Sequence, residues 1–302
     1  MSTQKVSVVD ESRRPSFTIV MLAWPVFIEQ ILVSLVSYVD TAMVGSMGAN
    51  ATAAVSISNS PNMLVNGTIM AIGVGFTAMI SRSIGAEDLQ RAKDLMRQAL
   101  LVVVALGLPL MCLLLLLAEK IPLWMGAQAE ILPDAAVYNR IIAASLIFRT
   151  MSMIITSIMR GYGDTKTPMF VNIGVNIVNV IGNFLLIYPT RTMSLFGMEF
   201  TMIGAGWGVA GAAAATSGSA TIGALIMLAV LFLKKGPMQL SIKGQYMPDW
   251  AILKTVFRIS LPAAFERIAM SSAGIITTST VATLGTVAVA ANSLYLTAES
   301  MC

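Results

Sequence analysis

The sequence predicts an all-α membrane protein: a polytopic helix bundle with a six-helix N-lobe and the start of a second six-helix lobe that repeats it in parallel. Three observations predict this fold class. The 302-residue chain is 56% hydrophobic and 11% charged, with a mean hydropathy of +0.80, whereas soluble domains carry about 25% charged residues. Long apolar runs alternate with short polar segments. The apolar run around position 262 also repeats the pattern of the run around position 25.

Eight apolar segments divide the chain, and each of the first seven can cross a hydrocarbon core, which needs about 20 residues. The segments are 17–45, 51–81, 97–118, 131–159, 168–189, 203–233, 254–283 and 286–302. The eighth reaches Cys302 with no polar flank, so we expect a helix cut short in a fragment of a longer protein. The predicted organisation is a cytoplasmic tail, an N-lobe, a cytoplasmic inter-lobe linker and the start of a C-lobe, at residues 1–16, 17–233, 234–253 and 254–302.

Composition excludes several function classes. The chain has no histidine, which excludes a histidine proton relay or metal site. Its two cysteines, Cys112 and Cys302, make no disulfide framework. The net charge of +4 comes from basic residues in short loops, which does not indicate nucleic acid. We therefore expect neither a resident cofactor nor a nucleic-acid partner.

The basic residues predict the orientation of the chain in the bilayer. With a cytoplasmic N-terminus, 14 of the 19 lysines and arginines fall on the inside, which is the bias that positive-inside topology requires. The linker at 234–253 is basic with interleaved apolar residues and suits the membrane surface. The segment TRTMSLFGMEFTM, at 190–202, falls on the outside and is expected to form a short hairpin. We expect a multi-pass protein of a bacterial-type plasma (inner) membrane.

The first span carries two acids, Glu29 and Asp40, and a proline, Pro25. Eleven residues separate the acids, so on a helix both point the same way, about 16 Å apart. Acids inside hydrocarbon are costly and usually face a bundle interior or a wet cavity. Asp40 is expected near the outer end and Glu29 nearer mid-depth. Two alternatives stay open: a structural carboxylate satisfied by polar neighbours, and a proline that is tolerated without acting as a hinge.

The fifth span has the clearest polar stripe. Its four asparagines, which lie within about 60° of one another on a helix, are Asn172, Asn176, Asn179 and Asn183. Asn183 falls at about the depth of Asp40. An aspartate and asparagines there offer oxygen ligands to a hard cation such as Na⁺. The alternative is that the stripe only joins helices by hydrogen bonds.

The second span has a similar polar face around Pro61. Its asparagines, Asn59, Asn62 and Asn66, either line a cavity or bond to neighbouring helices. The glycines further along this span, among them Gly73 and Gly75, permit close approach of another helix.

The seventh span repeats the first without gaps at an offset of 237 positions. The most specific matches are Pro25 with Pro262, Glu29 with Glu266 and Gly48 with Gly285. Both spans start from the cytoplasm, so the repeat is parallel, and a full second lobe would make about twelve spans. Asp40 is matched by Thr277 and has no acidic counterpart. This asymmetry favours coupling chemistry in the first lobe.

The chain resembles the multidrug and toxic compound extrusion (MATE) family over essentially all 302 residues. The resemblance rests on WPVFIEQ…YVDTAMVGSMGANATAA, ISRSIGAED, RGYGDTKTPM, GVAGAAAAT and LPAAFERI…LGTVAVAAN. It implies two six-helix lobes, alternating access, and export of cationic or amphipathic compounds coupled to inward Na⁺ or H⁺ flow. It assigns cation coupling to Asp40. In some members an aspartate stands at the position of Asn183, and the asparagine here departs from a two-acid proton site.

These observations assign roles to named residues. The expected ion-coupling residues are Asp40, Asn183 and Asn179, with Na⁺ at Asp40 as the only metal considered. The expected cavity-lining residues are Glu29, Tyr38, Asn59, Asn62, Asn66, Asn172, Asn176 and Glu266. The expected hinges are Pro25, Pro61 and Pro262.

The leading hypothesis is a monomeric, cation-coupled antiporter of small organic cations or amphipathic drugs. A lipid-linked oligosaccharide flippase of the same superfamily is the alternative, but its cavity should be basic and only Arg149 and Arg267 are candidates for that. A non-transporting membrane sensor or structural protein is the alternative from another class. An enzyme is not expected, because no nucleophile–base or metal constellation is present.

Overall fold

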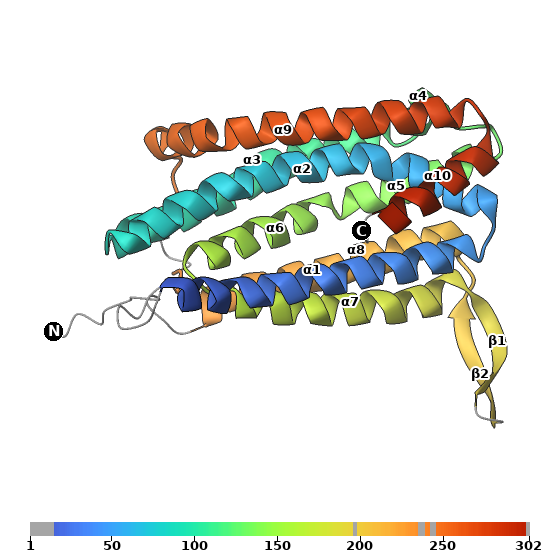
Figure 1. Cartoon of the computed structure of the whole chain (residues 1–302), viewed down its shortest axis with the longest axis horizontal. Helices are drawn as coiled ribbons and strands as arrows, with labels where there is room; N and C mark the ends of the chain where they lie inside the picture. The colour runs from blue at the N-terminus through green and yellow to red at the C-terminus, as the bar shows by residue number, and fades with distance from the viewer. Residues whose placement is uncertain (1–14, 196–197, 235–238, 242–245, 300–302) are drawn as a thin grey trace.

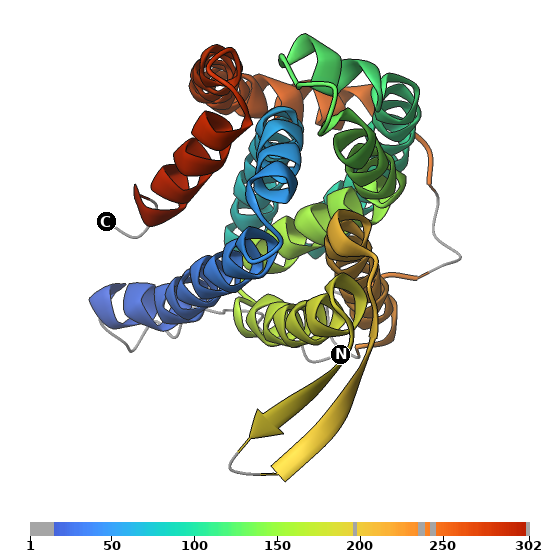
Figure 2. The ribbon, with the colours of Figure 1, turned by 90° about the vertical axis from the view of Figure 1, so that its right-hand side faces the viewer.

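The computed structural model describes residues 15–195, 198–234, 239–241 and 246–299. Long helices run side by side, and one β-hairpin projects from one end of the bundle (Figures 1 and 2). The helices are α1 (Pro15–Gly45), α2 (Ala49–Gly85), α3 (Leu89–Leu117), α4 (Lys120–Trp124), α5 (Leu132–Ala144), α6 (Leu146–Gly161), α7 (Lys166–Ile187), α8 (Gly208–Leu233), α9 (Trp250–Ala282) and α10 (Thr286–Glu299). The strands are β1 (Pro189–Leu195) and β2 (Met198–Ala205). An all-α membrane bundle is therefore confirmed.

Five helices of the described chain, α1, α2, α3, α7 and α8, are long and apolar enough to cross a membrane. A sixth span exists if the bent pair α5 and α6 counts as one. The sequence predicted seven complete spans, and α9 does not pass this test of apolarity. Its 33 residues are long enough, but charged and hydroxyl side chains along it lower its hydropathy.

The fourth predicted span, 131–159, is not one straight helix. It is broken between α5 and α6 at Ser145, and the two parts meet at an angle of 49°. The Ser145 hydroxyl donates to the Ile142 carbonyl at 2.9 Å and contacts the Ser217 hydroxyl at 3.0 Å. A serine hydroxyl that bonds to the preceding turn competes with the helix ladder and favours a bend. No glycine or proline marks the break, so the apolar pattern alone predicts a continuous helix.

The hairpin predicted for residues 190–202 is present, and its place outside the membrane stays a prediction. Strands β1 and β2 pair antiparallel, with Leu195 opposite Met198. Because β2 extends to Ala205, α8 begins at Gly208 and not at the start of the predicted segment 203–233. The hairpin leaves the bundle beside the end of α7 (Figure 2), and it marks the end at which α1 also finishes (Figure 1).

The turns of the sequence repeat have the same geometry. Gly48, between α1 and α2, and Gly285, between α9 and α10, both have a φ of +107°. Each accepts a backbone hydrogen bond at 3.2 Å from the residue four positions on, Thr52 and Val289. A positive φ of this kind strains any residue with a Cβ. The matched glycines therefore serve the same turn in both halves of the repeat.

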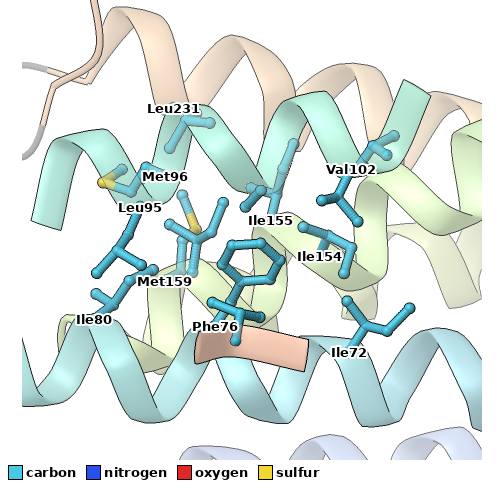
Figure 3. Packing of buried hydrophobic residues seen from close by; sticks show 14 of the residues in the cluster. Ile72, Phe76, Ile80, Leu95, Met96, Val102, Ile154, Ile155, Met159 and Leu231 are labelled. Carbon is cyan, nitrogen blue, oxygen red and sulfur yellow. The ribbon is translucent and has the colours of Figure 1, made fainter. Parts of the chain in front are cut away.

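The main hydrophobic core joins α2, α3, α6, α8 and α9. Figure 3 shows its centre, where Phe76, Leu95 and Ile155 interdigitate. All three are fully buried. Close packing of this kind is a general property of protein interiors. The core fixes the positions of five helices, and α1 lies outside it.

Helix α9 lies along α2 at close range (Figure 1). A Cβ at Gly75 would overlap the Ser260 hydroxyl of α9, and one at Gly73 would overlap the Ser157 hydroxyl of α6. The predicted close approach at these glycines is confirmed. Helix α2 is thereby held between α6 and α9.

Helix α1 has few buried positions. Among its described side chains, only Pro25, Glu29, Met43 and Val44 are buried. It runs beside α7 for most of its length (Figure 1). The contacts between these two helices, which include both acids of α1, decide where α1 sits.

Candidate functional site

Helices α1 and α7 run in the same direction and pair an acid with an asparagine at two levels. The Asn172 amide donates to Glu29 Oε1 at 2.6 Å. The Asn183 amide donates to Asp40 Oδ1 at 2.5 Å. Both pairs join positions 143 apart in the sequence, so the register between the two helices is constant. Eleven residues of helix separate the levels by about 16 Å.

The level that holds Asp40 and Asn183, which we call the upper level, opens into a cavity of about 270 Å³. We call this cavity the Asp40 cavity. Hydroxyl, amide and carboxylate side chains make up most of its wall. The lining residues are Ser37, Asp40, Thr41, Val44, Thr52, Val55, Asn59, Tyr138, Asn183, Ala212, Thr216 and Ser293. They come from α1, α2, α5, α7, α8 and α10, so the cavity lies where six helices meet.

A chain of hydrogen bonds leads from Asp40 into the bundle. Asn183, which bonds to Asp40, also approaches the Asn179 oxygen at 3.3 Å. The Asn179 amide donates to the Thr216 hydroxyl of α8 at 3.3 Å. Both asparagines are buried, at 1% and 5% exposure. Buried amides of this kind hold their partners in fixed positions, because leaving one unpaired is costly.

A second hydrogen bond crosses the same cavity. The Tyr138 hydroxyl of α5 donates to the Asn59 oxygen of α2 at 3.2 Å. Tyr138 is buried, whereas Asn59 is exposed. Asn59 thus lines the cavity from the open side, and Tyr138 closes it from the bundle side.

The Asp40 carboxylate has no basic partner in the part of the chain that the structure describes, where ion pairs are counted within 4.0 Å. The buried Asn183 Oδ1 likewise has no hydrogen-bond partner among these residues. A carboxylate and an unused amide oxygen, surrounded by hydroxyls, fit a hard cation that prefers oxygen ligands. No cluster of three or more acids, histidines or cysteines was found among the described residues. A single carboxylate suits one monovalent charge, such as Na⁺ or H⁺.

The level that holds Glu29 and Asn172, which we call the lower level, opens into a second cavity of about 470 Å³. We call this cavity the Glu29 pocket. Glu29 is 7% exposed and forms a salt bridge at 2.9 Å with Arg160, in the last turn of α6. Asn172 completes the group from the second turn of α7. The remaining lining residues are Met70, Val74, Thr77, Ala78, Ser152, Met153, Thr156 and Ser157. Glu29 is therefore held between Arg160 of α6 and Asn172 of α7, and its depth in the membrane stays a prediction.

The other expected cavity residues take different places. The Asn62 amide donates to the Ser58 carbonyl of its own helix at 2.8 Å. Asn66 and Asn176 are half-buried, and the Asn66 oxygen is buried without a partner among the described residues. Tyr38 is half-buried on α1. None of the four lines the Asp40 cavity or the Glu29 pocket.

Glu266 lines neither cavity and is exposed on α9. The side of α9 that packs on α2 carries Ser260 and Ser271. At about 100° per residue, Glu266 lies on the other side of the helix from both. Its match with Glu29 in the sequence repeat is therefore not a match in environment.

The three prolines lie inside continuous helices. Pro25 is buried in α1, and Pro262 is exposed in α9. Pro61 lies in α2 and lines a third, largely apolar cavity of about 560 Å³ together with Trp124 and Ile275. Their role as hinges stays a prediction.

The family model described as MatE matches residues 25–185, just over half of the chain. The chain belongs to the MatE family. The matched region contains α1 to α7 and both acid–asparagine pairs, apart from the start of α1 and the end of α7. The resemblance seen in the sequence is thereby confirmed.

Curated relatives agree with this family. The chain is 29% identical over 270 residues to "Uncharacterized transporter YisQ" of Bacillus subtilis, covering 89% of this chain and 57% of that protein. It is 28% identical over 283 residues to "Probable multidrug resistance protein NorM" of Thermotoga maritima, covering 94% of this chain and 58% of that protein. The chain thus spans a little over half the length of these relatives.

Solved structures of MATE transporters share the fold. The structure described as "Crystal structure of MATE in complex with MaD3S" has a TM-score of 0.80 at 26% identity, over 96% of this chain and 62% of that chain. An inward-facing MATE structure has a TM-score of 0.75 at 25% identity, over 86% of this chain and 56% of that chain. The helix arrangement of this MatE family chain is therefore that of a membrane transporter.

Sequence reasoning missed three residues that complete the two sites in this MatE family chain. Arg160 follows the apolar segment 131–159 and reads as one of the basic residues on the inside, yet it pairs with Glu29. Tyr138 and Thr216 lie in apolar or small-residue segments and were not singled out, although both line the Asp40 cavity. A tyrosine in an otherwise apolar helix is a usable signal, because its hydroxyl seeks a partner when the ring is buried.

Proposed function

We propose that this protein is a cation-coupled antiporter that exports cationic or amphipathic organic compounds by alternating access, with Na⁺ or H⁺ as the coupling cation at the Asp40 cavity. The observation that carries the proposal is the Asp40 carboxylate, which lies in a polar cavity inside the bundle with no basic partner among the described residues. The names of relatives such as "Probable multidrug resistance protein NorM" support drug export. The activity of the whole protein is part of the proposal, because the chain spans about 58% of that relative.

The coupling follows from charge. An uncompensated carboxylate inside a membrane bundle is costly, and a proton or Na⁺ removes that cost. Asp40 is joined to α7 through Asn183, so the charge on Asp40 changes the contact between α1 and α7. A cation that binds one conformation more tightly than the other shifts the equilibrium between them. An organic cation that prefers the opposite conformation is then exchanged for it.

The topology belongs to the same proposal. The family and the apolar helices support a multi-pass membrane protein. We place the N-terminus in the cytoplasm of a bacterial-type cell and the β-hairpin outside. In this orientation the Asp40 cavity is nearer the outer surface, and the Glu29 pocket is nearer the cytoplasm. A monomer is the proposed functional unit.

The main alternative, a flippase for lipid-linked oligosaccharides, fits the site less well. An anionic phosphate would have to enter a cavity whose ionisable side chains are a carboxylate and a tyrosine. Of the two arginines considered for that role, Arg267 is exposed on α9, and neither lines the Asp40 cavity.

The test is efflux of ethidium from bacterial cells that lack their own exporters and express the protein. The wild type should lower ethidium accumulation, and Asp40→Asn should abolish this effect while membrane expression stays the same. Asp134→Asn is the matched control, because Asp134 is exposed at the start of α5. Efflux by Asp40→Asn at the wild-type rate would contradict the assignment. Collapsing the Na⁺ gradient and the proton gradient separately then distinguishes the two coupling cations.

A further inference from the structure

The Glu29 pocket is lined by α1, α2, α6 and α7 and holds the second acid–asparagine pair of α1 and α7. Its acid–asparagine pair has the same register as the pair at Asp40 and lies about 16 Å away along the helices. Of the two acid–asparagine pairs, this one is nearer to the ends where α1 and α7 begin. By geometry alone, Glu29 and Asn172 form a second potential cation-binding site.

The charges at the two levels differ. Arg160 Nη2 lies 2.9 Å from Glu29 Oε2, so the acid of the Glu29 pocket already has a cation. Asp40 has no such partner within 4.0 Å in the described part of the chain. A mobile cation that approaches Glu29 meets the Arg160 guanidinium and gains little, because the attraction to the acid is offset by repulsion from the arginine.

The Arg160 guanidinium is bound to Glu29 and is also partly exposed. Its side chain is 30% exposed, whereas that of Glu29 is 9% exposed. The buried Nε of Arg160 makes no hydrogen bond among the described residues. The arginine is therefore held mainly through its contact with Glu29. A guanidinium is planar and permanently charged, so it makes such a contact with fixed geometry.

We propose that Arg160 is the built-in counter-cation of the Glu29 pocket, which prevents this pocket from retaining the coupling cation. This inference rests on the proposed function, since it concerns the cation that binds at Asp40. It assigns to Arg160 a positioning and specificity role, not a contact with the organic substrate.

The test counts bound Na⁺ with ²²Na⁺ on the purified full chain in nanodiscs. Arg160→Gln should bind about one more Na⁺ per chain than the wild type, because Glu29 and Asn172 are then free to hold it. The double variant Glu29→Gln/Arg160→Gln should return to the wild-type number. Arg160→Lys, which keeps the positive charge, should also bind the wild-type number. Equal Na⁺ binding by the wild type and Arg160→Gln would overturn the proposal.

A second measurement, of thermal stability against NaCl concentration, tests the Na⁺ site even if Arg160→Gln is less stable than the wild type. A ligand that binds only the folded state raises its thermal stability in proportion to the logarithm of its concentration. The Tm of Arg160→Gln should therefore rise between 1 mM and 100 mM NaCl by more than that of the wild type, with choline chloride as the ionic-strength control. A Tm that rises equally in both proteins, or equally with choline, would refute a new Na⁺ site.

The design separates this inference from the proposed function. In an Asp40→Asn background, Arg160→Gln should still add about one bound Na⁺, since the two levels are about 16 Å apart. Loss of efflux in Asp40→Asn tests the Asp40 cavity, and the extra Na⁺ in Arg160→Gln tests the Glu29 pocket. Either result can fail while the other holds.

Discussion

The Asp40 cavity and the Glu29 pocket are built from the same two helices, in the same register, with the same pair of residue types. At each level an asparagine of α7 donates to an acid of α1, at 2.5 Å and 2.6 Å. They differ in what the third helix supplies. In the Glu29 pocket α6 supplies an arginine, and at Asp40 the nearby helices supply hydroxyls and amides.

This difference underlies the proposed division between a structural acid, Glu29, and a cation-binding acid, Asp40. A buried acid paired with an arginine is neutral as a group, and it stabilises the fold only while both partners are present. A buried acid without a cation is unstable by itself, and it remains available to bind one. The identity of the acid and of its asparagine therefore does not decide its role. The neighbouring helix decides it.

The largest expected effect comes from breaking the charge pair at the lower level. Glu29→Gln leaves the half-buried Arg160 guanidinium without an anion, and this should lower the free energy of unfolding by about 3 kcal/mol. Asp40→Asn is the matched variant at the other level and should not lower it, because a neutral amide replaces an unpaired charge. Reversible unfolding in mixed detergent micelles, followed by tryptophan fluorescence, measures both. Equal destabilisation by the two variants would remove the distinction between the levels.

A smaller effect should follow from removing the asparagine at each level. Asn183→Leu removes a hydrogen bond to a charged acid and should cost about 2 kcal/mol of unfolding free energy. Asn172→Leu should cost about 1 kcal/mol, because Arg160 continues to bind Glu29. The same unfolding experiment compares them. A greater cost for Asn172→Leu would mean that Arg160 contributes less to Glu29 than the structure indicates.

The smallest effect concerns Asp164, an acid outside the spans at the same end as Glu29. Burial raises its pKa, but hydrogen bonds from Lys234 Nζ at 2.6 Å and from the Thr167 side chain and backbone outweigh burial and hold the pKa below its usual value. The ionised form is thus favoured in the folded state, and its contribution to stability is complete above the ordinary pKa of about 3.9. That contribution is lost as the pH falls through the lowered pKa.

Lys234 is half exposed, so solvent screens this pair and the contribution should stay below about 1 kcal/mol. The measurement is the difference in unfolding free energy between wild type and Asp164→Asn, from pH 6 down to pH 3. The difference should shrink as the solution becomes more acidic, and it should also shrink in high salt. A constant difference would show that Asp164 acts through something other than its charge.

Much of the fold could be predicted from residue periodicity and composition. Apolar length predicted the positions of most helices, and the hairpin expected for residues 190–202 is present. The gapless repeat predicted that Gly48 and Gly285 serve the same turn, and both have a φ of +107°. The helical wheel placed Asn183 on the inward side of its helix, and it is 1% exposed. Each of these depends on local chain geometry, which the order of residues encodes directly.

The side-chain contacts between residues on different helices depend on the tertiary structure. Arg160 and Glu29 are 131 positions apart, and no periodicity relates them. The Ser145 hydroxyl, at the bend, contacts Ser217 of α8, 72 positions away, and the exposure of Glu266 depends on which side of α9 packs on α2. A sequence determines the direction of a side chain relative to its own helix axis. Only the packing of helices determines what that side chain meets, and so which acid is neutralised and which is left free to bind a cation.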